Sequence, residues 1–189
     1  MEKVALDKEL VVKTAAAIAD AEGLDSITLT RVAKEFGISQ PALYRHVDGF
    51  DDLQRALSLM GRRMLATRLR EAAIGVSTDD AVRAMGLAWR AAVRDQPGLM
   101  AATDRYPCAG DAELEEAVED IVGAIELALV GYDLDEADQV HAARALRSAF
   151  HGFAHLEGGD GHPLPHDLDD TFDHIVELLC AGIRKLARD

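Results

Sequence analysis

The chain has few aromatic residues, few prolines and little cysteine. Among its 189 residues, aromatic side chains make up 5%, prolines number 5, and the two cysteines, Cys108 and Cys180, form no CxxC pair. This usage indicates neither a disulfide framework nor a zinc knuckle. Alternating runs of Val, Ile and Thr, which would indicate β-strands, are also missing. Because 49% of the residues are hydrophobic and the frequent Ala, Leu, Arg and Glu favour helices, the sequence predicts a packed, all-α protein.

Long hydrophobic runs and catalytic signatures are missing too. No apolar stretch approaches the ~20 residues needed to span a bilayer, and the N-terminal sequence MEKVALDKELVV has no apolar signal-peptide core. None of the patterns GxSxG, HExxH, GxGxxG or the P-loop occurs. We therefore expect a soluble, cytoplasmic protein without membrane contact, catalytic residues, cofactor or enzymatic activity.

Positive charge is scarce throughout the chain. Lys and Arg number 20 against 34 Asp and Glu, which gives a net charge of −14. Residues 1–60 hold 7 basic against 10 acidic residues, and residues 61–189 hold 13 against 24. The acidity lies mainly in the C-terminal part, but the N-terminal part is no basic patch either. Taken alone, this charge argues against nucleic-acid binding, so any affinity for DNA must come from a few well-placed donors and depend strongly on salt.

Capping residues and apolar spacing predict about nine helices. Asp7, Thr28 and Ser39 precede apolar periodic segments, as N-cap residues do, and Gly23 ends the first segment, as glycine often does. Pro41 lies in the first turn of the third helix, where proline is tolerated. We expect helices over about residues 7–23, 28–36, 39–47, 51–73, 77–96, 97–103, 112–130, 135–157 and 168–186.

The segment from Leu29 to Phe50, LTRVAKEFGISQPALYRHVDGF, carries the most information. It reads as two short helices joined by a sharp turn at Gly37. On a helical wheel of the second helix, Leu43 and Val47 share an inward face. This arrangement is typical of a recognition helix that enters the major groove of DNA, although an ordinary helical hairpin would bury the same two residues. The opposite arc and its flanks hold Gln40, Pro41, Ala42, Tyr44, Arg45 and His46.

These outward residues have chemistry suited to DNA. Gln40 can pair with adenine through N6 and N7, and the apolar pair Pro41–Ala42 can touch a thymine methyl group. Tyr44 and His46 suit phosphate or sugar, which fixes register rather than sequence, and Arg45 suits either role. The N–H groups at the start of the fourth helix can also hold a phosphate.

The segment SQPALYRHV resembles the recognition helix of the TetR family of bacterial transcriptional repressors, and it is particularly close to that of the tetracycline repressor. The wider match runs from about Leu10 to Leu57. The resemblance implies a three-helix helix-turn-helix DNA-binding domain over residues 1–50, followed by a ligand-binding and dimerisation domain over residues 51–189, with the helix at about 51–73 connecting them. Together with the outward arc, it gives these candidate DNA contacts: Thr28, Arg31, Ser39, Gln40, Pro41, Ala42, Tyr44, Arg45 and His46.

Two positions depart from the family pattern. Phe50 stands where members usually carry a lysine that grips phosphate, so the resemblance does not supply that contact. Thr30 occupies the place of an arginine with which the tetracycline repressor reads a base, so we expect a different operator sequence. Arg31 and Lys34 lie nearby in sequence and can partly compensate.

The C-terminal part is expected to bind a small molecule and a second copy of the chain. The resemblance implies a dimerisation domain here, and the wide apolar faces of the last two long helices predict a homodimer through the eighth and ninth helices. Two-fold symmetry also suits a palindromic operator. Met and aromatic residues at helical spacing suggest an apolar effector pocket, although such residues more often pack the core. The candidate effector-binding residues are Met60, Met64, Met85, Trp89, Tyr106, Phe150 and His151.

The favoured function is a transcriptional repressor that a small, largely apolar ligand releases from its operator. The acidic N-terminal part and Phe50 leave open a helical, protein-binding regulator with a weak or vestigial helix-turn-helix. A metal-dependent function rests only on histidines. His151 and His155, four residues apart, can share a metal, but no Cys or Glu completes an obvious tetrahedral set, so we expect no metal site.

Overall fold

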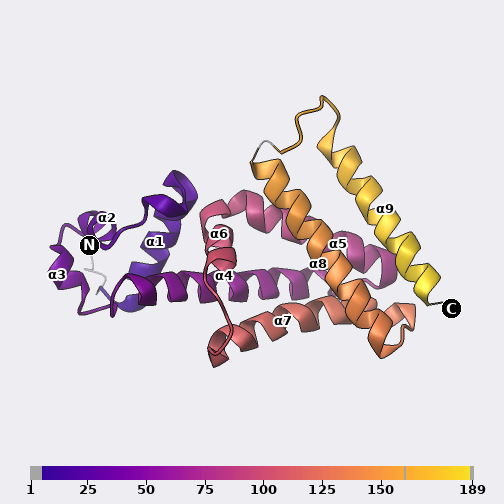
Figure 1. The fold of residues 1–189 in the computed structure, drawn as a ribbon, viewed down its shortest axis with the longest axis horizontal. Helices are drawn as coiled ribbons and strands as arrows, with labels where there is room; N and C mark the ends of the chain where they lie inside the picture. Colours follow the sequence, from indigo (N-terminus) through magenta and orange to yellow (C-terminus); the bar gives the residue numbers. More distant parts are fainter. Residues whose placement is uncertain (1–5, 160, 188–189) are drawn as a thin grey trace. The chain divides into compact units, whose positions relative to one another are not determined.

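Every regular element in the described part of the chain is helical. The computed structural model describes residues 6–159 and 161–187 (Figure 1). The prediction of an all-α fold with about nine helices is confirmed for these residues. Within them, none of the helices is long and apolar enough to cross a bilayer. The elements are α1 (Lys8–Glu22), η1 (Leu24–Ser26), α2 (Leu29–Glu35), α3 (Gln40–Leu43), α4 (Phe50–Ala72), α5 (Thr78–Asp95), α6 (Pro97–Arg105), α7 (Ala112–Leu129), η2 (Val130–Tyr132), α8 (Glu136–Gly158) and α9 (Leu168–Leu186).

The described chain packs into two compact units. The first unit holds the residues up to Arg62 together with Gln96–Glu115, and the second holds Arg63–Asp95 together with the residues from Glu116 onward. Helices α4 and α7 therefore each contribute residues to both units. The described part of the predicted DNA-binding domain lies in the first unit, and its boundary at residue 50 stays a prediction.

Capping bonds define the helices of the first unit. Asp7 Oδ1 accepts a hydrogen bond from the N–H of Leu10 at 2.8 Å, and Thr28 Oγ1 accepts one from the N–H of Arg31 at 3.0 Å. Helix α1 ends before Gly23, whose φ of 87° is accessible to glycine without strain. These bonds satisfy donors that helix ends leave unpaired. The predicted caps at Asp7 and Thr28, and the predicted end at Gly23, are confirmed.

Helix α6 packs directly on α1 within the first unit. The N–H of Leu99 donates to Asp20 Oδ1 at 2.9 Å. A Cβ added at Gly98 would lie 2.1 Å from the carbonyl carbon of Ala19, so only glycine lets these two backbones approach so closely. Helix α6 therefore belongs to the same compact body as the helix-turn-helix, although it is distant from it in sequence.

The second unit is built around α5, which packs against α8 and α9. Phe150 and Phe153 of α8 meet Phe172 of α9, with ring centroids 5.9 and 5.2 Å from that of Phe172. Gly86 of α5 makes room for this cluster, because a Cβ there would lie 2.7 Å from the Phe150 ring. The close approach of three helices thus depends on one glycine and three aromatic rings.

A single arginine crosses this core. The Arg90 side chain is 12% exposed and lies over the Phe153 and Phe172 rings, 5.4 and 5.3 Å from their centroids. Its Nε donates to Glu157 at 2.7 Å and its Nη1 to Asp169 at 2.6 Å. Charge-assisted hydrogen bonds and stacking on aromatic faces both stabilise a guanidinium that has left water. Arg90 therefore links α5 to α8 and to the start of α9.

Candidate functional site

Backbone hydrogen bonds close the turn between α2 and α3. Gly37 has a φ of 63°, in the left-handed region, and its N–H and that of Ile38 both donate to carbonyl groups near the end of α2 at 3.1 Å. Leu43 and Val47 are 0% and 2% exposed. The predicted inward face of the recognition segment is therefore confirmed.

Helix α3 is shorter than predicted. Regular helix covers Gln40–Leu43, whereas the expected range ran to residue 47. Beyond Leu43 the backbone tightens, and the N–H of His46 bonds to the Leu43 carbonyl at 2.9 Å. Gly49, with a φ of 128°, then redirects the chain. Because Tyr44 keeps right-handed helical angles (φ −62°, ψ −9°), the side chains after Leu43 continue the outward arc.

Ser39 occupies the N-cap position of α3, but its hydroxyl makes no capping hydrogen bond. Proline has no N–H, so Pro41 removes one possible donor. The N–H of Ala42 bonds to the Ser39 carbonyl at 2.9 Å instead. The predicted side-chain cap is wrong for this reason, and the exposed Ser39 hydroxyl is available to another partner.

The recognition segment turns its predicted contact residues outward. Arg45 makes no ion pair with any described residue, and neither does Lys34 on α2. Both cations are therefore available to phosphate, which is the main source of affinity for DNA. Tyr44 is 50% exposed, Gln40, Pro41 and Arg45 are also exposed, and Ala42 and His46 are half-buried.

Thr30 contacts Gln40 across the helix-turn-helix. Its hydroxyl donates to Gln40 Oε1, with 2.9 Å between the oxygens. The two residues are ten apart in sequence, and no periodic pattern links them. This contact was not predicted, because it depends on how the turn brings α2 and α3 together.

Two further cations of the first unit are engaged by carboxylates. The Arg31 guanidinium contacts Glu22 at 2.6 Å and also pairs with Glu35, and the hydrogen bond to Glu22 is the main reason that the pKa of Arg31 is raised. Lys8 Nζ lies 2.6 Å from Asp52 Oδ1. A phosphate would have to compete with these carboxylates for either cation, so the predicted DNA contact of Arg31 stays a prediction.

The start of α4 is occupied by acidic groups. Phe50 is 39% exposed and is followed by Asp51 and Asp52. Asp52 Oδ2 accepts from the N–H of Asp48 at 3.0 Å. Burial opposes ionisation of Asp52, but the hydrogen bonds from Lys8 and Asp48 lower its pKa overall. The Asp52 carboxylate thus holds a donor that lies just before α4, and the predicted phosphate site at the start of this helix stays a prediction.

The predicted effector-binding residues divide between the two units. In the first unit, the Tyr106 hydroxyl donates to Asp51 Oδ2 at 3.0 Å, which raises the pKa of the phenol. The Tyr106 side chain lines a cavity of about 50 Å³, which suits water rather than a drug-sized molecule. That all seven residues line one pocket stays a prediction. Met60 and Tyr106 belong to the first unit, and Met64, Met85, Trp89, Phe150 and His151 belong to the second.

Trp89 carries an unsatisfied polar group inside the second unit. Met85, Trp89 and Phe150 are each 2% exposed, as core residues are. The Trp89 and His151 rings meet edge to face with their centroids 6.2 Å apart. The centroids of the His151 and His155 rings are 4.1 Å apart. The Trp89 indole N–H is buried and bonds to no described residue. An unsatisfied buried donor costs about 1–3 kcal/mol, so an acceptor placed there would be stabilising.

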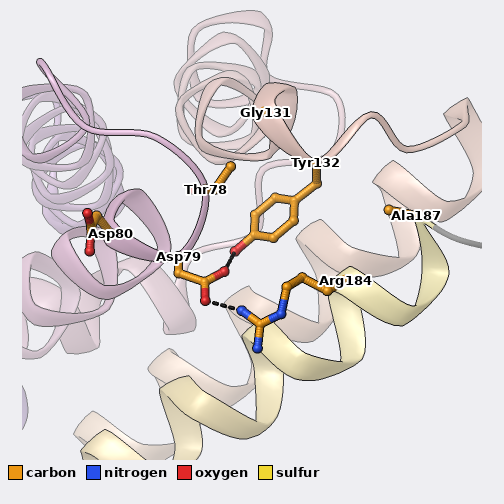
Figure 2. A pocket seen from close by; sticks show the side chains of 7 residues that line it. All are labelled: Thr78, Asp79, Asp80, Gly131, Tyr132, Arg184 and Ala187. Atoms are coloured by element: carbon orange, nitrogen blue, oxygen red, sulfur yellow. Dashed lines mark hydrogen bonds and ion pairs between the residues drawn. The ribbon is translucent and has the colours of Figure 1, made fainter.

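A surface cavity of about 480 Å³ lies where α5 begins, beside η2 and the end of α9 (Figure 2). The Tyr132 hydroxyl donates to Asp79 Oδ1 at 2.6 Å, and Arg184 pairs with the other oxygen of that carboxylate. The Tyr132 hydrogen bond is the main cause of the lowered pKa of Asp79. This cavity was not predicted, because an acidic first turn is already explained by the helix dipole. Its lining residues are Thr78, Asp79, Asp80, Gly131, Tyr132, Arg184 and Ala187.

Comparison with known proteins gives a consistent assignment. The model of the tetracyclin repressor-like C-terminal domain matches residues 82–179. The chain is 34% identical over 181 residues to the HTH-type transcriptional regulator Rv0681 of Mycobacterium tuberculosis, which covers 95% of this chain and 83% of that regulator. It is 33% identical over 114 residues to the HTH-type transcriptional repressor DrrR1 of Streptomyces coeruleorubidus, which covers 60% of this chain and 41% of that repressor.

The fold agrees with a solved TetR structure. A TetR variant from Acinetobacter baumannii, crystallised with minocycline, matches with a TM-score of 0.71 and 21% identity over 97% of this chain and 99% of that chain. Regulators of this kind bind DNA operators and ligands, form dimers and are not enzymes. The helix-turn-helix geometry, the matching C-terminal domain and the relationship to Rv0681 lead to one conclusion: this chain belongs to the TetR family of transcriptional regulators.

Proposed function

We propose that the protein is a repressor that binds a palindromic operator as a homodimer and leaves it when a small, largely apolar ligand binds. Residues 1–50 form the DNA-binding domain and residues 51–189 the ligand-binding and dimerisation domain. The proposal is supported by one observation. Gln40, Pro41, Tyr44 and Arg45 are exposed, whereas Leu43 and Val47 of the same segment are buried. The relative from Streptomyces coeruleorubidus, which is named a repressor, supports the direction of regulation.

The helix-turn-helix combines contacts to base edges with contacts to phosphate. Gln40 and the pair Pro41–Ala42 meet base edges in the major groove. Tyr44 and His46 meet the DNA backbone and fix the register. The remaining contacts to phosphate and sugar come from Thr28, Arg31, Ser39 and Arg45.

Two glycines with open space beside their α-carbons support a dimer through α8 and α9. Gly152 lies within α8 and Gly182 within α9, and a Cβ added at either would meet nothing within 4 Å. Glycine inside a helix costs about 1 kcal/mol relative to alanine, and packing within this chain does not explain that cost. Close approach by α8 and α9 of a second copy of the chain explains why glycine stands at these two positions. Leu156 and Leu178, 50% and 73% exposed on these helices, would be covered by that copy.

Trp89 supports the ligand part of the proposal. The ligand places an apolar body beside Met85 and Phe150 and a hydrogen-bond acceptor on the buried Trp89 N–H. The related fold crystallised with minocycline shows that such a scaffold holds a drug-sized molecule in that protein. Ligand binding shifts the population of the dimer from a state that fits the operator to one that does not.

Gel shifts at low salt test the DNA part directly. The purified protein is expected to retard DNA from upstream of its own or a neighbouring gene at concentrations that leave random DNA of the same length unbound. Equal affinity for both DNAs would contradict the proposal. The variant Gln40→Ala should reduce the difference, because Gln40 meets a base edge, whereas Lys13→Ala should not, because Lys13 lies on α1 in an ion pair with Glu9.

The single tryptophan gives a direct test of ligand binding. Trp89 is the one tryptophan in the chain, so its fluorescence reports on its own surroundings. In a screen of apolar compounds, true ligands should change this fluorescence, raise the melting temperature and release the operator. Ligands that raise the melting temperature and release the operator equally well with the wild type and with Trp89→Phe would contradict the role of the indole N–H.

A further inference from the structure

Thr30 and Gln40 form a pair that the DNA would meet as a unit. Thr30 lies in the first turn of α2 and Gln40 at the start of α3, and the Thr30 hydroxyl donates to Gln40 Oε1 over 2.9 Å. Both side chains are exposed. The turn at Gly37 fixes α2 and α3 relative to each other, so the contact between Thr30 and Gln40 depends on the folded helix-turn-helix.

The hydrogen bond changes what Gln40 can offer. A side-chain amide carries an oxygen with two acceptor lone pairs and a nitrogen with two donor hydrogens. The Thr30 hydroxyl occupies one of the two lone pairs, whereas Nε2 makes no hydrogen bond to any described residue. Water competes with the Thr30 hydroxyl in the unbound protein, but docking on DNA removes that water and strengthens the bond.

The bases differ in what they need from this amide. Adenine pairs with glutamine through N6, which donates, and N7, which accepts, so it needs both the oxygen and the nitrogen of the amide. Guanine presents two acceptors, N7 and O6, and needs only donors. An amide with one of its two acceptor positions taken by Thr30 and both donor hydrogens available therefore suits guanine better than adenine.

We propose that Thr30 is a specificity-determining residue, which holds the Gln40 amide as a donor and directs it to guanine. This inference rests on the proposed function, because it requires Gln40 to reach a base edge. Thr30 acts by positioning Gln40 and need not touch DNA. The expected preference for guanine over adenine at the Gln40 position is roughly tenfold, the size of one good base contact.

The test is a selection from randomised DNA followed by sequencing, with full-length protein. Gln40→Ala identifies the position in each half-site that Gln40 reads, because base preference is lost there alone. Wild-type protein should prefer guanine at that position. Thr30→Val keeps the shape but lacks the hydroxyl, and should shift the preference to adenine or abolish it. Thr30→Ser restores a hydroxyl and should restore guanine.

The outcomes separate the inference from the function beneath it. Adenine at the Gln40 position of the wild type, or the same base preference in wild type and Thr30→Val, overturns the role of Thr30 while leaving DNA binding intact. A palindrome whose base preferences do not change in Gln40→Ala also overturns it. Enrichment of no palindrome by the wild type overturns the proposed function as well. Thr14→Val, on α1, is the matched control and should select the same palindrome as the wild type.

Discussion

The two compact units differ in how their buried polar groups are satisfied. The first unit buries Arg62, whose guanidinium donates to Ser58 and to the carbonyl groups of Thr103 and Tyr106, and it turns its recognition side chains to solvent. The second unit places Arg90 over two aromatic rings and leaves the buried indole N–H of Trp89 without a partner among the described residues. The difference suits two kinds of partner: a charged polymer that approaches from outside, and a small molecule that enters a core.

The sharpest way to break the first unit is to separate α6 from α1. Gly98→Ala places a methyl group 2.1 Å from the carbonyl carbon of Ala19. Because that neighbour is backbone and cannot rotate away, we expect a loss of more than about 3 kcal/mol in the free energy of unfolding. Urea titration measures it. Gly123→Ala on α7 meets nothing within 4 Å and should be neutral or stabilising, so equal effects of the two changes would contradict the packing described.

Removing Arg90 tests the second unit in the same way. Arg90→Ala leaves Glu157 without its partner and takes a cation from the faces of two rings. We expect the free energy of unfolding to fall by about 2–3 kcal/mol. Arg83→Ala is the matched control, because the Arg83–Asp173 pair is exposed and should contribute less than about 1 kcal/mol. A similar loss in both variants would show that Arg90 is an ordinary surface cation.

A single substitution in the second unit is expected to weaken the dimer. Gly182→Leu adds a side chain to α9 at a position where a Cβ would meet none of the described atoms within 4 Å. We expect the dimer dissociation constant to rise about tenfold or more in analytical ultracentrifugation, because overpacking an interface typically costs 1–3 kcal/mol. Gly123→Leu on α7 should leave it unchanged. An unaltered dimer in Gly182→Leu would place the interface elsewhere.

The scarcity of unpaired cations on the first unit should limit the salt dependence of operator binding. With Lys34 and Arg45 available on each helix-turn-helix, and Arg31 proposed to reach phosphate, about six phosphates are neutralised per dimer. The slope of log affinity against log salt should then be about −5.5, since each contact contributes roughly −0.9. Arg45→Ala should reduce the slope by about 2 in an anisotropy titration. A slope of about −3.5 would mean that Arg31 stays with its carboxylates and would contradict its phosphate contact.

Acid titration should give a smaller effect, which can be followed at Asp111 of the first unit. The hydrogen bond from Arg55 lowers the pKa of Asp111 from 3.8 to about 2. Because the folded pKa lies below the unfolded one, this stabilisation is complete above about pH 4 and is lost as pH falls toward 2. Carboxyl NMR titration should find the low pKa of Asp111 in the wild type and a higher value in Arg55→Gln. The same pKa in both proteins would contradict the pairing.

The first unit was predictable because its determinants are local. Caps at Asp7 and Thr28, the turn at Gly37 and the inward pair Leu43 and Val47 each follow from a few neighbouring residues. The missing cap at Ser39 and the shortened α3 show the limit of such rules, because one proline two positions later removed the donor.

The interactions that place functional groups in the second unit were not predictable, since they join residues distant in sequence. Nothing near Arg90 in sequence indicates that Phe153, Phe172 and Glu157 surround it. The contact between Thr30 and Gln40 shows the same limit inside the first unit. Helical spacing assigned Trp89 to an inward face, but it did not reveal that the indole N–H has no partner there.

The most direct test of the account is the affinity of the dimer for its selected palindrome when the outward arc is altered. Tyr44→Ala and Arg45→Ala combined remove two exposed side chains, neither of which belongs to the buried core. In an anisotropy titration at low salt, we expect binding to weaken about a hundredfold or more, with circular dichroism and dimer mass unchanged. Unchanged affinity in a folded, dimeric double variant would contradict the claim that this arc reads DNA.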